Sequence, residues 1–119
     1  MDAQRLVETY IRCLSAGDME GVLALFTADA IVHSPLYGDL GATEFYTKLA
    51  ADTRSSEIRF TELFQSTTNT QSLALRFTYR WRLASGLEKV FDCVDILCTN
   101  EAMDIRELTI IYDTHPRPF

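Results

Sequence analysis

Hydrophobic residues recur every three to four positions in the first half of the chain, which is the period of a helix. Asp2 is placed to cap the first helix, and Gly17 is suited to end it. Asp18 then caps a second helix that we expect to continue through about Phe26. The inward stripes of these two helices are Leu6, Val7, Tyr10, Ile11 and Leu14, followed by Val22, Leu25 and Phe26.

A short strand and a third helix follow. The strand spans residues 30–34 and ends at Pro35, because proline cannot donate to a strand ladder. Asp39 is predicted to cap the third helix, and residues 54–56 are predicted to form a linker after it. The helical spacing of this segment joins Ala42, Phe45, Tyr46, Leu49, Ala50 and Thr53.

From residue 57 onward the hydrophobic period is two, which indicates strands over residues 57–65, 72–83, 89–98 and 105–113. Helices followed by hairpin-linked strands predict one α+β domain over residues 1–119, with three helices packed on a strongly curved antiparallel sheet. A sheet bent in this way and closed by helices encloses a cone-shaped pocket, whose apolar interior is the natural ligand site. The last six residues include two prolines and are expected to be neither helix nor strand.

The strand over residues 89–98 carries one carboxyl group on each face. Side chains alternate along a strand, so Asp95 shares a face with Phe91 and Leu97, whereas Asp92 lies on the other face. An unpaired carboxylate among apolar neighbours is costly, so its pKa rises. The neutral acid is then a hydrogen-bond donor that can hold an oxyanion. Alternation does not choose between Asp92 and Asp95, and either could instead bond a turn or a backbone amide.

Composition narrows the range of partners. The net charge of −6 argues against nucleic acid and anionic membrane surfaces as partners. The apolar runs are too short to span a membrane, and no basic-then-apolar leader opens the chain.

Three cysteines without a CxxC pair indicate reduced thiols in a cytoplasmic protein. His33 and His115 are far apart in sequence, without cysteine or carboxylate at ligand spacing, so we expect no metal site. We also expect no cofactor.

Four segments form a pattern that spans most of the chain: residues 10–18, 24–35, 38–46, and 92–96 together with the last strand. In this order and at this spacing they resemble the ketosteroid isomerase and SnoaL-like branch of the nuclear transport factor 2-like superfamily. The resemblance implies a cystatin-like α+β barrel with a ligand cavity and no cofactor.

In ketosteroid isomerases a tyrosine and a protonated aspartic acid bind the dienolate oxygen, and a second aspartate moves the proton. The resemblance implies that Tyr10 and Asp95 form the oxyanion site here, which favours Asp95 over Asp92. It also implies that Tyr46 supports the site and that Tyr112 forms an aromatic wall. With Phe26, these two residues are the expected substrate-binding residues. Tyr10 could otherwise be an ordinary residue of its helical stripe.

The family's catalytic base corresponds to Ser34. A serine hydroxyl does not abstract a carbon-bound proton near neutral pH without a base of its own, which argues against steroid isomerisation by the usual route. His33 is adjacent and titrates in the right range. In a regular strand His33 points to the opposite face, unless a bend at Pro35 redirects it, and a structural or surface role is the alternative.

Two hypotheses follow. The first is an enzyme acting on a small apolar carbonyl compound, with isomerase, cyclase or dehydratase chemistry. Tyr10 and Asp95 would stabilise an enolate, and His33, a water held by Ser34 or the substrate itself would move the proton. The alternative is a non-catalytic module that binds a small ligand or another protein. In either case the apolar faces of residues 73–83 and 90–98 predict a homodimer.

Overall fold

The computed structural model describes residues 1–113, 115 and 119. Most of the expectation for the last six residues lies outside these described residues. The helices are α1 (Ala3–Ala16), α2 (Met19–Leu23) and α3 (Ala42–Asp52). The strands are β1 (Phe26–Ser34), β2 (Gly38–Gly41), β3 (Thr53–Gln65), β4 (Ser72–Leu83), β5 (Glu88–Thr99) and β6 (Ile105–Asp113).

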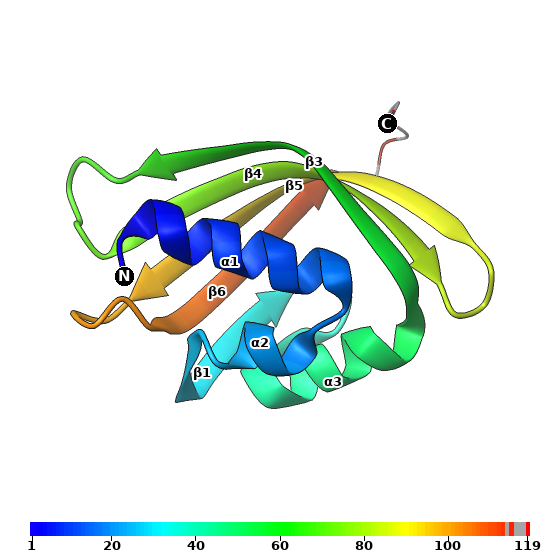
Figure 1. Ribbon diagram of the computed structural model, residues 1–119, viewed down its shortest axis with the longest axis horizontal. Coiled ribbons are helices and arrows are strands. Elements are labelled where there is room, and N and C mark those ends of the chain that lie inside the picture. The colour runs from blue at the N-terminus through cyan, green and yellow to red at the C-terminus, as the bar shows by residue number, and fades with distance from the viewer. Residues whose placement is uncertain (114, 116–118) are drawn as a thin grey trace.

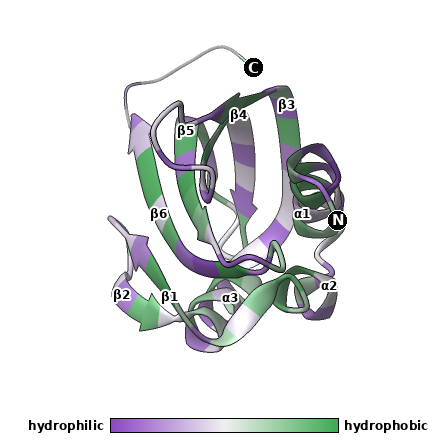
Figure 2. Cartoon of the chain, turned by 90° about the vertical axis from the view of Figure 1, so that its left-hand side faces the viewer, coloured by the Kyte–Doolittle hydropathy of each residue, from purple (hydrophilic) through white to green (hydrophobic). Residues whose placement is uncertain are grey.

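The strands form one sheet in the order β2-β1-β6-β5-β4-β3. Neighbouring strands are antiparallel except β1 and β6, which run parallel, so the sheet is not purely antiparallel as expected. The sheet is strongly curved, and the helices lie on its concave side (Figure 1). Seen from the side, the sheet remains open between its β2 and β3 edges (Figure 2). The predicted class, three helices on a curved sheet, is confirmed.

The first helix begins and ends where local sequence signals predict. The Asp2 carboxylate accepts a hydrogen bond from the backbone N–H of Arg5 at 2.8 Å, which satisfies a free donor of the first turn. Gly17 ends the helix with φ of 72° and donates to the carbonyls of Cys13 and Leu14. That left-handed conformation is one that glycine adopts without steric cost.

The second helix is shorter than predicted. Asp18 caps it as expected, accepting from the backbone N–H of Gly21 at 2.9 Å. However, the helix ends at Leu23, and β1 already begins at Phe26 rather than at residue 30. The reason is tertiary: Phe26 is paired with Ile105 of β6, a contact that helical spacing does not reveal.

The predicted cap of the third helix is wrong. Asp39 lies in β2, a four-residue strand that the sequence did not reveal, and Gly41 occupies the N-cap position. Asp39 pairs with His33 across β1 and β2, and its carboxylate bonds the His33 ring. That cross-strand contact replaces the expected cap.

The predicted linker at residues 54–56 is also wrong. β3 begins at Thr53, directly after α3, and its first residues pair with the end of β4, with Thr53 opposite Leu83 and Ser56 opposite Trp81. These backbone groups join a ladder, so the segment is a strand and not a loop.

The concave face of the sheet is apolar and covered by helices. In β4 every second residue points inward and is buried: Leu73, Leu75, Phe77, Tyr79 and Trp81. Helices α1 and α3 add their own buried stripes against this face. No helix of the described chain has the length and apolar character needed to cross a membrane.

Candidate functional site

A cavity of about 140 Å³ lies between the helices and the concave face of the sheet. Its walls are mainly aromatic and come from α3, β4, β5 and β6: Phe45, Phe77, Tyr79, Trp81, Phe91 and Tyr112. An apolar concave space with few polar groups is the usual form of a small-molecule site.

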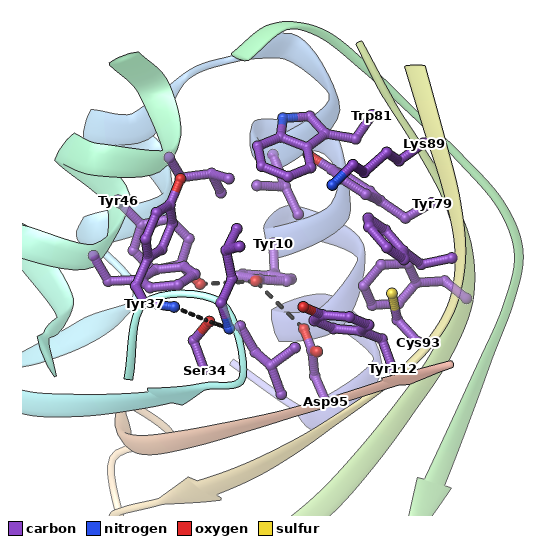
Figure 3. A pocket seen from close by; sticks show the side chains of 17 residues that line it. Tyr10, Ser34, Tyr37, Tyr46, Tyr79, Trp81, Lys89, Cys93, Asp95 and Tyr112 are labelled. Atoms are coloured by element: carbon purple, nitrogen blue, oxygen red, sulfur yellow. Dashed lines mark hydrogen bonds between the residues drawn. The ribbon is translucent and has the colours of Figure 1, made fainter. Parts of the chain in front are cut away.

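Three polar side chains meet within this cavity, each from a different element (Figure 3). The hydroxyl of Tyr10 lies 2.8 Å from the hydroxyl of Tyr46, and either group can donate. Tyr10 also donates to Oδ2 of Asp95 across a longer distance of 3.5 Å. All three side chains are buried, with relative exposures of 2%, 0% and 2% for Tyr10, Tyr46 and Asp95.

Ordinary helix and strand periodicity brings this cluster together. Tyr10 belongs to the buried stripe of α1, and Tyr46 belongs to that of α3. The Tyr46 ring packs edge-on against Phe45, with centroids 4.8 Å apart, which fixes its direction. Asp95 lies on the inner face of β5, opposite Leu75 of β4. Apart from the two tyrosine hydroxyls, the Asp95 carboxyl group therefore lies in apolar surroundings.

The surroundings of Asp95 favour its neutral form. Burial raises its pKa from 3.8 to about 7, and the hydrogen bond from Tyr10 opposes that rise. Its second oxygen, Oδ1, is buried without a hydrogen-bond partner among the described residues. Burial also raises the pKa values of Tyr10 and Tyr46, so both phenols keep their protons and act as donors near neutral pH.

Ser34 lines the cavity, but its oxygen already has two partners. The hydroxyl accepts hydrogen bonds from the backbone N–H groups of Leu36 at 3.0 Å and Tyr37 at 3.2 Å. A hydroxyl oxygen has two lone pairs, so both are engaged. Ser34 therefore holds the turn after β1 and brings Leu36 and Tyr37 to the cavity.

The structure does not bring His33 to the cavity. Its Nδ1 lies 2.8 Å from Asp39 Oδ1, and its Nε2 lies 2.9 Å from Glu107 Oε2. The hydrogen bond to Glu107, and to a lesser extent the one to Asp39, raises the pKa of His33. The bend at Pro35 does not redirect His33, because these carboxylates of β6 and β2 hold it on the face opposite Ser34.

Of the other two expected binding residues, one lies at the cavity and one does not. Tyr112 lines the cavity and packs against Phe91, with ring centroids 4.7 Å apart. Phe26 is not among the described residues that line it. Instead its ring packs behind Tyr46, 5.5 Å between centroids, because β1 begins at this residue and turns it into the core.

Several lining residues were not predicted: Tyr37, Tyr79, Trp81, Lys89 and Cys93. Alternation along β4 and β5 could have identified four of them, because they share the inner face with Asp95. Tyr37 enters from a turn, for which the sequence offers no periodic signal. Within the described chain, no group of three His, Cys, Asp or Glu side chains is arranged to hold a metal ion.

Comparison with known proteins supports the fold. Residues 7–107 match the SnoaL-like domain. No curated protein matches the sequence significantly.

Three solved structures illustrate the fold. A candidate polyketide cyclase from Pseudomonas putida KT2440 is 22% identical, with a TM-score of 0.82 over 98% of this chain and 95% of that chain. An NTF2-like protein of unknown function from Exiguobacterium sp. 255-15 is 16% identical, with a TM-score of 0.77 over 91% and 98%. A protein with a ketosteroid isomerase-like fold from Catenulispora acidiphila DSM 44928, in complex with trimethylamine, is 12% identical, with a TM-score of 0.77 over 94% and 88%. At these identities the likeness concerns the fold.

Proposed function

Because the chain belongs to the SnoaL-like family, we propose that it is an enzyme acting on a small apolar carbonyl compound. Tyr10 and Asp95 hold the carbonyl oxygen of that compound and stabilise it as an enol or enolate. The observation that carries the proposal is the buried Oδ1 of Asp95, which has no partner among the described residues and belongs to a side chain lining an apolar cavity.

The three polar groups divide the work. With Tyr46 as the donor of the Tyr10–Tyr46 hydrogen bond, the Tyr10 proton points to Oδ2 of Asp95 across a long 3.5 Å, and a ligand oxygen can take the place of that acceptor. Protonated Asp95 supplies the second donor. Donors fixed in place in a dry cavity stabilise a developing negative charge more strongly than water does.

The position of the catalytic base in ketosteroid isomerases is occupied here by Ser34, which has no carboxylate. Of the described residues that line the cavity, only Asp95 carries a carboxyl group. Ser34 has both lone pairs engaged, and His33 lies outside. The site therefore suits a substrate that enolises readily, such as a β-dicarbonyl compound, because its acidic C–H needs only a weak base. Cyclisation or dehydration within one molecule fits this limit.

Binding of an enolate mimic tests the proposal. A naphthol of low pKa is titrated into the parent, Tyr10→Phe and Asp95→Asn proteins by calorimetry. Tyr10→Phe is expected to bind about tenfold more weakly, since it loses one hydrogen bond to a charged oxygen. Asp95→Asn is also expected to bind more weakly, because it replaces the acid O–H donor with an amide N–H. Asp92→Asn is the matched control, because Asp92 lies on the other face of the same strand. If both variants bind the naphthol like the parent, there is no oxyanion site.

The absent carboxylate favours one second candidate, a binding module without turnover. The Ser34→Asp variant separates the two, because an aspartate can accept the same two backbone hydrogen bonds and adds a carboxylate. Both proteins are assayed with a panel of enones and β-dicarbonyl compounds. Turnover by the parent supports the enzyme, and turnover by Ser34→Asp alone supports the binding module.

We also propose a homodimer, through a narrower surface than the sequence indicated. The apolar face of residues 73–83 is the inner face and is covered, so it is not available. The outer face of β5 and β6 remains, where Val94 lies opposite Ile111, which is 53% exposed. Sedimentation at micromolar concentration should show a dimer. The cytoplasmic location and the single domain over residues 1–119 stay predictions.

A further inference from the structure

Among the described residues, one cation reaches the cavity that holds Tyr10, Tyr46 and Asp95. Lys89 lies on the inner face of β5, six residues before Asp95 on the same face, and it pairs with Trp81 of β4. Figure 3 shows the Lys89 side chain running beside Trp81 and ending over the same cavity that Tyr10 and Asp95 enter from the other end. The two polar ends are separated by roughly 20 Å along the strand backbone, at about 3.3 Å per residue.

No described side chain neutralises Lys89. Its ammonium has neither an ion pair nor a hydrogen bond within the described part of the chain, whereas each arginine of β4 pairs with a carboxylate. Of the described residues that line the cavity, Lys89 is the sole cation. The rim of the cavity at Lys89 therefore carries a positive charge without a counterion among the described residues.

The wall between these two ends is aromatic, and its neighbouring rings are tilted by 43° and 45° to one another. The rings of Trp81 and Phe91 lie 6.4 Å apart, and those of Phe91 and Tyr112 lie 4.7 Å apart. Such a wall offers both ring faces and ring edges to an aromatic ligand, and both arrangements are favourable for aromatic pairs. At the inner end, Oδ1 of the buried Asp95 has no hydrogen-bond partner among the described residues and can bond an oxygen of the ligand.

We propose that the ligand is an aromatic, carboxylate-bearing carbonyl compound, with its carbonyl oxygen against Tyr10 and Asp95 and its carboxylate against Lys89. This inference rests on the proposed function and adds the second recognition point. A neutral acid at the inner end does not repel the anion, and the aromatic wall partly shields the ion pair from water, which strengthens the pair.

A pair of matched ligands tests the inference. The first is a hydroxynaphthoate whose carboxylate is on the ring opposite its hydroxyl, and the second is the corresponding carboxamide, which has the same size without the charge. Both are titrated into the parent, Lys89→Met, Lys89→Arg and Asp95→Asn proteins. Lys89 is exposed, so its variants should fold like the parent, and a melting curve checks this.

In the parent, the carboxylate should bind about two- to fivefold more tightly than the amide, as an exposed ion pair provides. Lys89→Met should remove this preference and Lys89→Arg should retain it, and added salt should reduce it. Asp95→Asn should weaken both ligands equally and leave their ratio unchanged.

The outcomes separate the inference from the proposed function. A parent without the preference, or a preference that survives Lys89→Met, overturns the inference even where Asp95→Asn still weakens both ligands. A preference that depends on Lys89 while Asp95→Asn has no effect removes the oxyanion site and leaves only an anion-binding rim, which also contradicts the ligand proposed here. Failure of both ligands to bind the parent contradicts both proposals.

Discussion

The two faces of β5 show how one strand can hold two carboxyl groups in opposite states. On the outer face, Asp92 forms an ion pair with Arg76 at 3.1 Å, and its side chain is 19% exposed. On the inner face, Asp95 is 2% exposed, receives one long hydrogen bond from Tyr10, and has no ion pair with any described residue. Three positions along the chain therefore separate an ion-paired carboxyl group from a buried one whose pKa is raised to about 7.

The difference follows from what covers each face. The outer face carries the arginines of β4 with their carboxylate partners, and water reaches it. The inner face is covered by α1 and α3, whose apolar stripes exclude water. Burial without a counterion raises the pKa of a carboxyl group. The helices thus determine which of the two aspartates can act as an acid.

Truncations on the two faces of β6 should give the largest contrast in stability. Leu108 is fully buried on the inner face, and Ile111 is 53% exposed on the outer face. Leu108→Ala should lower the free energy of unfolding by about 2–5 kcal/mol, because it leaves a cavity in the core. Ile111→Ala should change it by less than about 0.5 kcal/mol in the monomer. Urea unfolding measures both, and equal losses would show that the two faces are not packed differently.

The second contrast is the pH dependence of stability in Asp95→Asn and Asp92→Asn. The pKa of Asp95 is higher in the folded than in the unfolded protein. Its contribution to stability is therefore complete below pH 4, falls as the pH rises, and is lost above about pH 7.

Asn cannot ionise, so Asp95→Asn should gain stability relative to the parent between pH 4 and pH 7. At about 1.4 kcal/mol for each pKa unit, the upper bound of this gain is about 4 kcal/mol. Asp92→Asn should show no such gain, because its carboxylate pairs with Arg76. A flat difference between parent and Asp95→Asn across this range would contradict the account.

His33 should show a smaller pH effect on stability in the same direction as Asp95: its contribution is present at low pH and is lost as the pH rises. Glu107 and Asp39 raise its pKa in the folded protein, so its stabilising contribution is complete below its unfolded pKa of 6.5 and is lost as the pH rises through the folded value. His33→Gln should lose under about 1 kcal/mol at pH 5, since a third of the side chain is exposed and solvent screens both pairs. At pH 9 the variant should equal the parent in thermal unfolding. Loss of ligand binding in this variant would instead favour a role in the cavity.

The smallest effect concerns the ion pair on the outer face. Arg76→Gln should cost about 0.2–1 kcal/mol at low salt, and the cost should shrink as salt is added. Chemical unfolding at two ionic strengths measures it. A loss as large as that of Leu108→Ala would mean that water does not reach this face.

Local signals predicted much of the fold. The caps Asp2 and Asp18, the stop at Gly17 and the alternation in β4 and β5 depend on neighbours in sequence, and the structure retains them. β2 and the parallel pairing of β1 with β6 could not be predicted, because strands distant in sequence create them.

The candidate site, too, could be predicted only in part from neighbours in sequence. Alternation placed one aspartate on each face of β5, but the two faces are similarly apolar in sequence, and the resemblance to ketosteroid isomerases pointed to Asp95. The helices that cover one face set the difference in burial. His33 lies with Asp39 and Glu107 for a similar reason, since both partners come from other strands.

Titration of Asp95 tests the central claim most directly. The carboxyl-carbon NMR signals of labelled aspartate are followed from pH 3 to pH 9, and the Asp95→Asn variant assigns the signal. The account predicts one midpoint near pH 7 that is absent from the variant. If every aspartate in the parent titrates below about pH 5, as solvated carboxylates do, Asp95 is ionised at neutral pH and is no hydrogen-bond donor to a ligand.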